Sequence, residues 1–422
     1  MEIALFTDSF APTHDGVARV TADLADSLAR RGHSVRVYAP GLGRRSAPAE
    51  LRSSGVRVRR FRAVPVPLYG QYRWPVFPYL SLRGEGLTGV DVVHLHSPGG
   101  IGSLGFLAAR HFRTPLVGTF HTDIWAMRES LPQKWLVPLF FRCAWWFNLG
   151  LYWRCDRVTA PSRAAAQVLD AHARKPFRPP IQILPNGIDT HRFAPDRRAP
   201  EWRTREGWGD RPIVTYLARW TRDKGIHRFL DAVAAARPKT EFLAVVAGRG
   251  PEDSAVRDRI ARDRHLRERT RLVGPVPEEE KASLLAASTI FVLPSVSDTG
   301  GIALLEAMAS GVCAVALRQG GPAETITDGV TGRLADPADP PALARILSEL
   351  LDRPEERERM ARAGLDWVRR TASLEVMTDR YLAIYRAANS GSRCALPEED
   401  GPVGSFRPGP QLPEPLNPRL LA

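Results

Sequence analysis

Two acidic residues and two glycines stand close together in one short segment of the chain. Asp298 and Glu306 lie eight positions apart, and Gly300 and Gly301 lie between them. Carboxylates suit the binding of sugar and ribose hydroxyls because they accept strong hydrogen bonds. Glycines let the backbone approach a ligand closely. The segment could therefore bind a sugar nucleotide, although the same pattern also fits a surface loop before an ordinary buried helix.

The elements on either side of this segment support a ligand site. Residues 290–293 are apolar and predict a buried strand, and the small apolar residues from Ile302 onward predict a helix. A helix start presents unpaired backbone N–H groups and the positive end of the helix dipole. A diphosphate can bind there without a metal ion. The segment would also lie at the carboxyl end of a strand, where open α/β sheets bind ligands.

Strands and helices alternate along the first half of the chain. Residues 3–6 predict a strand, and Val17, Val20, Leu24 and Leu28 predict an amphipathic helix. Further strands are predicted at residues 34–38, 90–95, 116–120 and 158–160. This alternation indicates a parallel sheet wrapped by helices.

A second parallel sheet is predicted in the other half of the chain, with strands at residues 213–217, 242–248, 271–274, 290–293 and 312–317. The Pro- and Arg-rich stretch before Pro212 separates the two series and predicts an interdomain connection. We expect an N-terminal domain over residues 1–190 and a C-terminal domain over residues 191–373. A helix at 374–388 is expected to return to the N-terminal domain, and residues 389–422, rich in Pro, Gly and Ser, are expected to be disordered.

Composition narrows the class of protein. The 422 residues, 44% of them hydrophobic, are enough for two domains with full cores. The four cysteines show no C-x-x-C spacing, so neither a zinc site nor a disulfide framework is indicated. An acid at position 2 and a short apolar run argue against a signal peptide, and the apolar stretch 135–153 is too interrupted to span a bilayer. We therefore expect a cytoplasmic protein.

Positive charge is concentrated in the first half of the chain. The net charge is +13, and residues 1–190 hold 24 Lys and Arg against 13 Asp and Glu. Such a field suits an anionic substrate, an anionic lipid or nucleic acid. No recognised nucleic-acid motif is present, so we do not expect nucleic-acid binding.

Several short motifs occur in a particular order: FTDSFAP (6–12), DGV (15–17), HLHSP (94–98), GTFHTD (118–123), PS (161–162), LPNGID (184–189), Arg219 with DKG (223–225), GRGP (248–251) and the segment 298–306. In this order they resemble family 4 of the retaining glycosyltransferases. The resemblance covers roughly residues 1–388 and is strongest to mannosyltransferases that use GDP-mannose. It implies the GT-B fold, in which two Rossmann-like domains face each other across a cleft. The N-terminal domain would bind the acceptor and the C-terminal domain the nucleotide sugar.

The resemblance implies roles for four residues outside the acidic segment. Arg219 and Lys224 match the pair that binds the donor diphosphate and stabilises the charge that develops on it. Gly16 matches the glycine that leaves room for diphosphate and acceptor at a helix start. His121 matches the histidine that hydrogen-bonds the donor sugar. Outside this family, the two cations could be merely solvated and the histidine merely structural.

Within the acidic segment, Glu306 matches the acid that binds the ribose hydroxyls. Gly300, Gly301 and Ile302 would offer backbone N–H groups to phosphate or sugar. Two positions depart from the family pattern, because Asp298 replaces the usual Glu and Gly300 replaces a common aromatic residue. The carboxylate is kept but its reach is shorter, which affects the expected sugar preference more than activity.

The implied reaction is transfer of a hexose from a nucleotide diphosphate sugar to a lipid-linked or saccharide acceptor, with retention and an α-linkage. GDP-mannose is the first choice of donor and UDP-glucose the alternative. The chain contains no Asp-x-Asp, so we expect neither a required divalent cation nor another cofactor. The departures at Asp298 and Gly300 leave a second class open, a non-catalytic binding protein on the same scaffold.

An aromatic and basic stretch suggests where the acceptor comes from. Five tryptophans lie among arginines and lysines, a combination typical of the headgroup level of a membrane. They are Trp125, Trp135, Trp145, Trp146 and Trp153. A lipid acceptor and peripheral contact with an anionic membrane, at its inner face, would follow, but the same aromatics could equally pack in the domain core. Residues 68–75 are a candidate acceptor-side loop.

Overall fold

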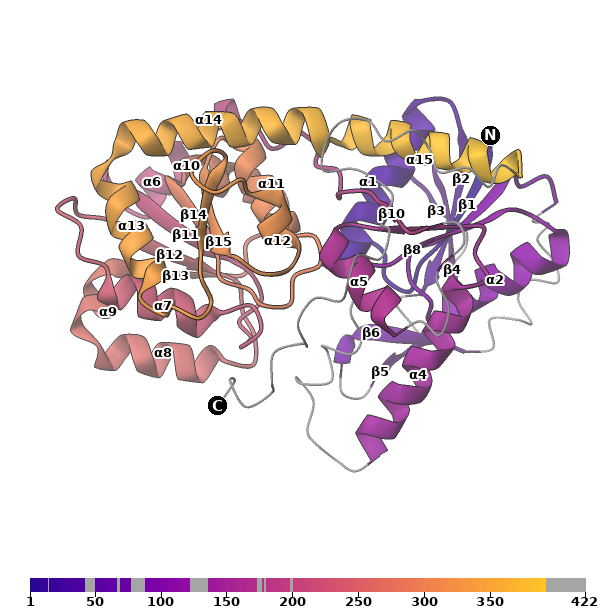
Figure 1. Ribbon diagram of the computed structural model, residues 1–422, viewed down its shortest axis with the longest axis horizontal. Helices are drawn as coiled ribbons and strands as arrows, with labels where there is room; N and C mark the ends of the chain where they lie inside the picture. Colours follow the sequence, from indigo (N-terminus) through magenta and orange to yellow (C-terminus); the bar gives the residue numbers. More distant parts are fainter. Residues whose placement is uncertain are drawn as a thin grey trace.

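The computed structural model describes residues 1–13, 15–41, 50–66, 69–76, 88–121, 136–172, 177, 180–197 and 200–391. These residues form two α/β domains that lie side by side (Figure 1). Most of the expected tail, residues 392–422, lies outside the described part.

The N-terminal domain is built on a sheet of eight described strands in the order β10-β9-β8-β7-β1-β2-β4-β3. They are β1 (Glu2–Phe6), β2 (Ser34–Pro40), β3 (Glu50–Leu51), β4 (Arg57–Phe61), β7 (Val92–Leu95), β8 (Leu116–Thr119), β9 (Arg157–Ala160) and β10 (Gln182–Ile183). All pairs are parallel except β3 with β4. Every residue of β7 and β8 is buried because helices cover both faces of the sheet.

Four helices in the described part of this domain follow strands of the sheet: α1 (Gly16–Arg30), α2 (Gly100–Phe112), α4 (Leu136–Tyr152) and α5 (Arg163–Ala171). Helix α1 packs on one face of the sheet, and residues of α2, α4 and α5 form the core on the other. The amphipathic helix predicted from Val17 to Leu28 is α1.

The prediction that residues 68–75 form an acceptor-side loop is wrong. The described residues of this stretch form strand β6 (Tyr69–Pro75), which pairs antiparallel with β5 (Ala63–Val66). Aromatic and polar residues alternate only from Tyr72 to Trp74, and aromatic residues suit a pleated strand as well as they suit an exposed loop.

The C-terminal domain has a six-stranded parallel sheet in the order β13-β12-β11-β14-β15-β16. The strands are β11 (Ile213–Leu217), β12 (Leu243–Ala247), β13 (Thr270–Gly274), β14 (Ile290–Leu293), β15 (Cys313–Leu317) and β16 (Gly332–Ala335). Its helices are α6 (Pro200–Arg205), α7 (Ile226–Ala235), α8 (Asp253–Arg262), α9 (Arg264–Arg269), α10 (Lys281–Ala287), α11 (Ile302–Ala309), α12 (Gly320–Thr325) and α13 (Ala342–Asp352). The predicted α/β class with two parallel sheets is confirmed.

Two long helices run along one edge of both domains (Figure 1). Helix α14 (Pro354–Thr371) packs on the C-terminal domain, and α15 (Leu374–Asn389) packs against α1 and the N-terminal sheet. Between them, Ser373 bridges to Ile188, so the chain crosses between the domains twice at one place. Tyr381 and Tyr385 of α15 are buried in the core with Leu5 of β1.

None of the helices in the described part of the chain is long and apolar enough to cross a membrane.

Candidate active site

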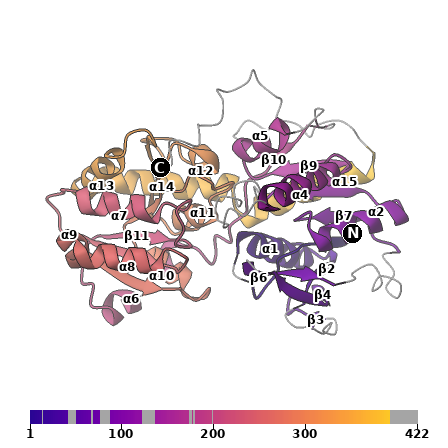
Figure 2. The same ribbon diagram turned by 90° about the horizontal axis from the view of Figure 1, so that it is seen from below.

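The starts of two helices meet where the domains face each other. Asp15 caps α1 by accepting a hydrogen bond from the backbone N–H of Ala18 at 2.8 Å, and Gly16 is the first helical residue. Helix α11 starts at Ile302 after Gly301, whose φ of +55° favours glycine. A Cβ on Gly16 would lie only 2.8 Å from Cδ1 of Ile302. Figure 2 shows α1 and α11 on the facing sides of the two domains.

The loop after β11 brings positive charge to this region. Lys224 Nζ lies 2.9 Å from Asp298 Oδ2, so the predicted cation and the predicted acid form an ion pair. The exposed Arg219 guanidinium has no hydrogen bond or ion pair among the described residues. Burial alone would raise the pKa of Asp223, but two nearby hydroxyl groups and the charges of Lys224 and Arg219 lower it. Both cations therefore favour negative charge in this loop.

Thr299 ties the acidic segment to the N-terminal domain. Its hydroxyl donates to the backbone oxygen of His121 at 2.8 Å, and its own carbonyl accepts from Ser162 Oγ at 2.7 Å. Sequence analysis gave neither Thr299 nor Ser162 a role, although both lie in quoted motifs. Their contacts depend on the arrangement of the two domains, which no local pattern encodes.

Gly300 lies in the same domain contact. A Cβ at this position would come within 2.4 Å of Asn186 Nδ2 and 3.0 Å of Pro161 Cβ. The aromatic residue common in the family would not fit in this arrangement. The departure from the family pattern at Gly300 is therefore matched by the close approach of the N-terminal domain.

His121 lies just beyond the carboxyl end of β8, in a partly buried position. Its Nε2 is 3.0 Å from Nδ1 of His96. Burial lowers the pKa of His121 to about 4, so the imidazole is neutral near pH 7. A neutral imidazole can offer one N–H donor and one acceptor, without carrying charge.

Glu306 is a buried acid, with 3% of its surface exposed, and its carboxylate accepts no hydrogen bond among the described residues. Burial raises its pKa, opposed by the nearby charges of Lys281, Arg19 and Arg192. All three cations instead form ion pairs with Glu278, at 2.7 Å for Lys281 and 2.9 Å for Arg192. This cluster spans both domains, since Arg19 belongs to α1, and sequence analysis missed it.

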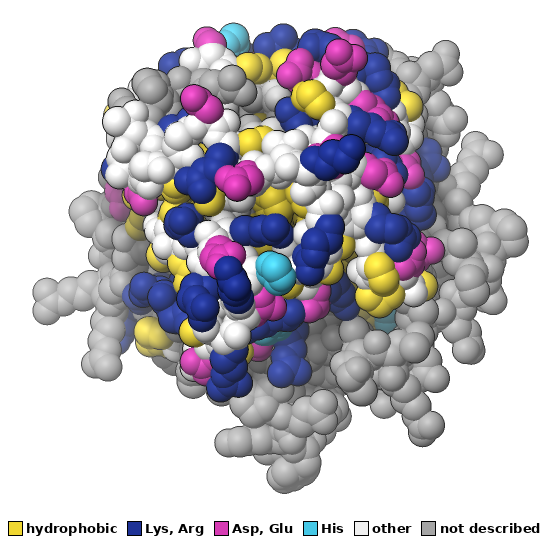
Figure 3. All heavy atoms as spheres, turned by 90° about the vertical axis from the view of Figure 1, so that its left-hand side faces the viewer, with side chains coloured by type: hydrophobic (Ala, Val, Ile, Leu, Met, Phe, Trp, Pro, Cys, Tyr) yellow, Lys and Arg dark blue, Asp and Glu magenta, His cyan; other side chains and the backbone are white. Residues whose placement is uncertain are grey.

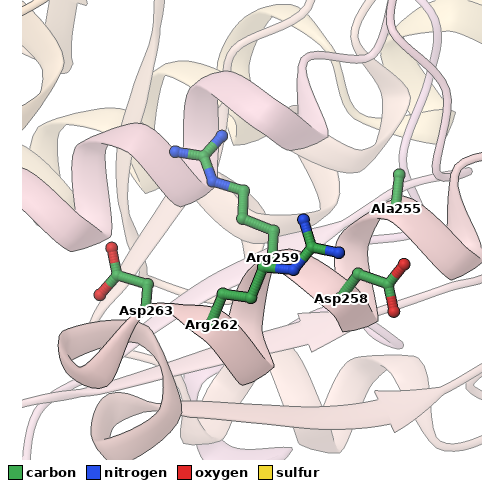
Figure 4. A pocket seen from close by; sticks show the side chains of 5 residues that line it. All are labelled: Ala255, Asp258, Arg259, Arg262 and Asp263. Carbon is green, nitrogen blue, oxygen red and sulfur yellow. The ribbon is translucent and has the colours of Figure 1, made fainter.

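The described residues contain no group of three or more His, Cys, Asp or Glu side chains that could hold a metal ion. A surface hollow does occur, but along α8, at the outer end of the C-terminal domain. It contains none of the predicted residues; Asp258 and Asp263 flank Arg259 and Arg262 there (Figure 4). Basic and acidic side chains are interspersed on this end of the molecule (Figure 3), and Arg259 pairs with Asp231.

Comparisons with known proteins identify the family. The model for "Glycosyltransferase Family 4" matches residues 14–192, and the model for "Glycosyl transferases group 1" matches residues 199–367. A GDP-mannose-dependent alpha-mannosyltransferase of Mycolicibacterium smegmatis is 33% identical over 80% of this chain and 84% of its own. The chain is a member of glycosyltransferase family 4. A second protein of that name, from Mycobacterium tuberculosis, is 30% identical over 83% of this chain and 89% of its own.

Solved structures show the same fold for this glycosyltransferase. The crystal structure of Anabaena HepE in complex with UDP and glucose superposes with a TM-score of 0.72, at 20% identity, over 92% of this chain and all of that one. The resemblance to GT-B glycosyltransferases that the motifs indicated is thus confirmed in family and in fold.

The glycosyltransferase brings most of its predicted site residues to one boundary between the domains. Gly16 meets Ile302, and Lys224 pairs with Asp298. His121 is connected to the acidic segment through Thr299, and Arg219 lies exposed in the loop of Lys224. Glu306 lies farther along α11, among the charged cluster at Glu278.

Proposed function

We propose that this enzyme transfers mannose from GDP-mannose to a lipid-linked or saccharide acceptor, with retention of the anomeric configuration. The meeting of the α1 and α11 starts, at Gly16 and Ile302, carries the proposal. The positive dipole ends of two helices come together there, with the first backbone N–H groups of each helix other than that of Ala18, which is donated to Asp15. Such an arrangement favours a diphosphate. The names of relatives at 33% and 30% identity support mannose and GDP. UDP-glucose remains the alternative donor.

The residues around the two helix starts can each take a separate role in the reaction. Negative charge grows on the leaving nucleoside diphosphate as the glycosidic bond breaks, and Lys224 and Arg219 would stabilise it in place of a divalent cation. Glu306, a buried acceptor without a hydrogen-bond partner in the described chain, would bind the ribose hydroxyls. Asp298 and His121 would orient the sugar.

Helix α4 supports a lipid acceptor. Trp145 is buried at 3% exposure, whereas the next residues, Trp146 and Phe147, are 38% and 54% exposed. The aromatic stretch is therefore divided: Trp145 belongs to the core, Trp153 packs partly buried against it, and Trp125 and Trp135 lie outside the described residues. We infer that Trp146 and Phe147 lie at the headgroup level of an anionic membrane.

Vesicle sedimentation tests the membrane contact. The enzyme should bind vesicles of phosphatidylglycerol and phosphatidylcholine, and Phe147→Ser should bind more weakly, whereas Val330→Ser, an exposed apolar residue of the C-terminal domain, should bind like wild type. Equal binding of all three proteins would contradict the inference.

Donor turnover tests the activity. GDP-mannose and UDP-glucose are titrated with and without EDTA, and donor hydrolysis and transfer are followed. We expect GDP-mannose to be used with the higher kcat/KM and EDTA to have no effect. Lys224→Ala should lower kcat/KM by about 10²–10³-fold, as the loss of one preorganised cation would. Lys239→Ala, a surface change in the same domain, should have little effect.

Three results would contradict the proposal. Higher kcat/KM with UDP-glucose would overturn the donor, and loss of activity with EDTA would overturn the metal-free mechanism. An inverted product anomer, seen by proton NMR of the transferred sugar, would overturn retention.

A further inference from the structure

Three histidines gather at the carboxyl ends of two neighbouring parallel strands. His94 lies in β7, His96 follows that strand, and His121 follows β8. The rings of His96 and His121 stack with centroids 5.2 Å apart and planes 14° from parallel. The rings of His94 and His96 have centroids 4.0 Å apart. The stack therefore reaches from the sheet interior to the predicted site residue His121.

The innermost histidine is fully hydrogen-bonded. Nδ1 of His94 lies 2.8 Å from the hydroxyl of Tyr385, and Nε2 lies 2.7 Å from Oγ1 of Thr119. Tyr385 belongs to α15, so the helix that returns to the N-terminal domain hydrogen-bonds the innermost histidine. Since hydroxyls can donate or accept, they fit either tautomer of His94.

His96 is different because only one of its ring nitrogens has a partner. Nδ1 lies 3.0 Å from Nε2 of His121, whereas Nε2 is buried and has no hydrogen-bond partner in the described part of the chain. Burial lowers the pKa of both rings, so each carries a single N–H near pH 7. The hydrogen shared by the pair must sit on Nδ1 of His96 or on Nε2 of His121.

The buried nitrogen decides between these two arrangements. If His121 donated, His96 would carry its own hydrogen on Nε2, leaving a buried N–H donor without an acceptor. Orphaned buried N–H groups are rarer in proteins than acceptors with unused lone pairs. The hydrogen of His96 therefore belongs on Nδ1, where it is donated to Nε2 of His121. His121 must then carry its hydrogen on Nδ1, which has no hydrogen bond among the described residues but, unlike Nε2 of His96, belongs to a side chain that is only partly buried.

We propose that His96 is a positioning residue that fixes His121 in the Nδ1–H tautomer, so that His121 presents an N–H donor to an oxygen of the bound sugar. The contact to sugar rests on the proposed function, whereas the tautomer does not. The hydrogen bond from Thr299 to the carbonyl oxygen of His121 holds the same residue from the C-terminal domain. Ring tautomer and backbone position are thus fixed from two sides.

Nitrogen-15 NMR of the histidine side chains tests the tautomer directly. The full-length enzyme is labelled on histidine and measured near pH 7.5 without donor, and His121→Asn assigns the resonances of His121. We expect a protonated, pyrrole-type Nδ1 and an unprotonated, pyridine-type Nε2. A protonated Nε2 on His121 would overturn the proposal, whatever the activity.

Two substitutions test whether His96 is the cause. His96→Phe keeps a ring in the stack but removes the donor, so His121 should move toward the Nε2–H tautomer and kcat with GDP-mannose should fall about tenfold, which equals the roughly 1.4 kcal/mol of one hydrogen bond. His96→Asn can place an amide N–H near the position of Nδ1 and should restore both. The exposed His265→Phe serves as control.

The outcomes separate the tautomer from the proposed function. An unchanged His121 tautomer in His96→Phe, or no recovery in His96→Asn, would contradict the positioning role. If His96→Phe does not fold, the wild-type assignment alone decides. If wild type turns over neither GDP-mannose nor UDP-glucose, the proposed function fails while the tautomer assignment stands or falls by NMR.

Discussion

At the scale of single residues, Asp298 forms an ion pair with Lys224 although its side chain is one methylene shorter than that of Glu. The distance from Asp298 Oδ2 to Lys224 Nζ is 2.9 Å. Asp298→Ala should lower kcat/KM about 10–100-fold, because a sugar hydroxyl and Lys224 each lose a partner, at roughly 1–3 kcal/mol. Asp298→Glu should stay active but change the ratio of kcat/KM between GDP-mannose and UDP-glucose. Steady-state kinetics measure both.

The exposed Asp258→Ala, on α8, is the matched control for that experiment. Full activity of Asp298→Ala would remove Asp298 from the site.

The buried histidines predict how stability depends on pH. Burial lowers the pKa of His94, His96 and His121 below 6.5 in the folded protein. As the pH falls from about 6.5 to about 4, the unfolded chain binds protons at these positions and the folded chain does not, so the free energy of unfolding should decrease. Urea denaturation across this range should show a shallower decrease in His96→Asn and an unchanged one in His265→Asn. Equal slopes in all three proteins would argue against the lowered pKa of His96.

Sequence alone could place some of these residues and not others. Lys224 and His121 follow predicted strand ends, so their presence at the carboxyl edge of a sheet could be expected from local patterns. Thr299 and Glu278 could not be found in this way, since their partners lie in the other domain or the linker. A local pattern carries no information on how two separately folded sheets face each other.

At the scale of elements, the meeting of α1 and α11 makes a specific prediction. Gly16→Ala would place a methyl group against Cδ1 of Ile302, so it should raise the KM for GDP-mannose by roughly tenfold by forcing the helix starts apart. Ile302→Val removes Cδ1, and the double variant should recover most of the loss. A double-mutant cycle on KM measures this coupling.

The control for the cycle is Gly150→Ala in α4, where the nearest atom to the new methyl is the flexible end of Arg154 at 3.4 Å. Additive effects of Gly16→Ala and Ile302→Val would mean that the two helix starts do not touch in the working enzyme.

Elements differ in how well their sequence specified them. Strands such as β14 and β15 are continuous apolar runs, and only a sheet covered on both faces buries such a run, so these were predicted within a residue or two. The positions of the aromatic residues of β6 and α4 were harder to predict. An aromatic side chain suits a core, a pleated strand or an exposed face, and only the fold put Trp145 inside and Phe147 outside.

At the scale of the whole molecule, polar contacts between described residues join the domains at two places, besides the chain crossings and the meeting of α1 and α11. One is the ion-pair cluster of Arg19 with Glu278. The other is at α5, where Ser162 donates to Thr299 and Glu324 of α12 accepts from the first backbone N–H groups of the helix. Thr299 also donates to the carbonyl oxygen of His121, so we expect closure of the domains to be coupled to assembly of the site.

Glu324 offers the cleanest test of that coupling. Its carboxylate accepts from the N–H groups of Arg163 at 2.7 Å and Ala164 at 2.6 Å, and a negative charge at a helix start is stabilising by about 0.3–2 kcal/mol. Glu324→Ala should therefore favour separated domains, with a larger radius of gyration in X-ray scattering and a KM for GDP-mannose raised about two- to tenfold. Glu324→Gln, which keeps one acceptor oxygen, should fall between. The exposed Glu279→Ala should match wild type in both measurements. If Glu324→Ala scatters like wild type yet loses affinity, the contact acts on the site without holding the domains together, and closure is governed by the Arg19 and Glu278 cluster instead.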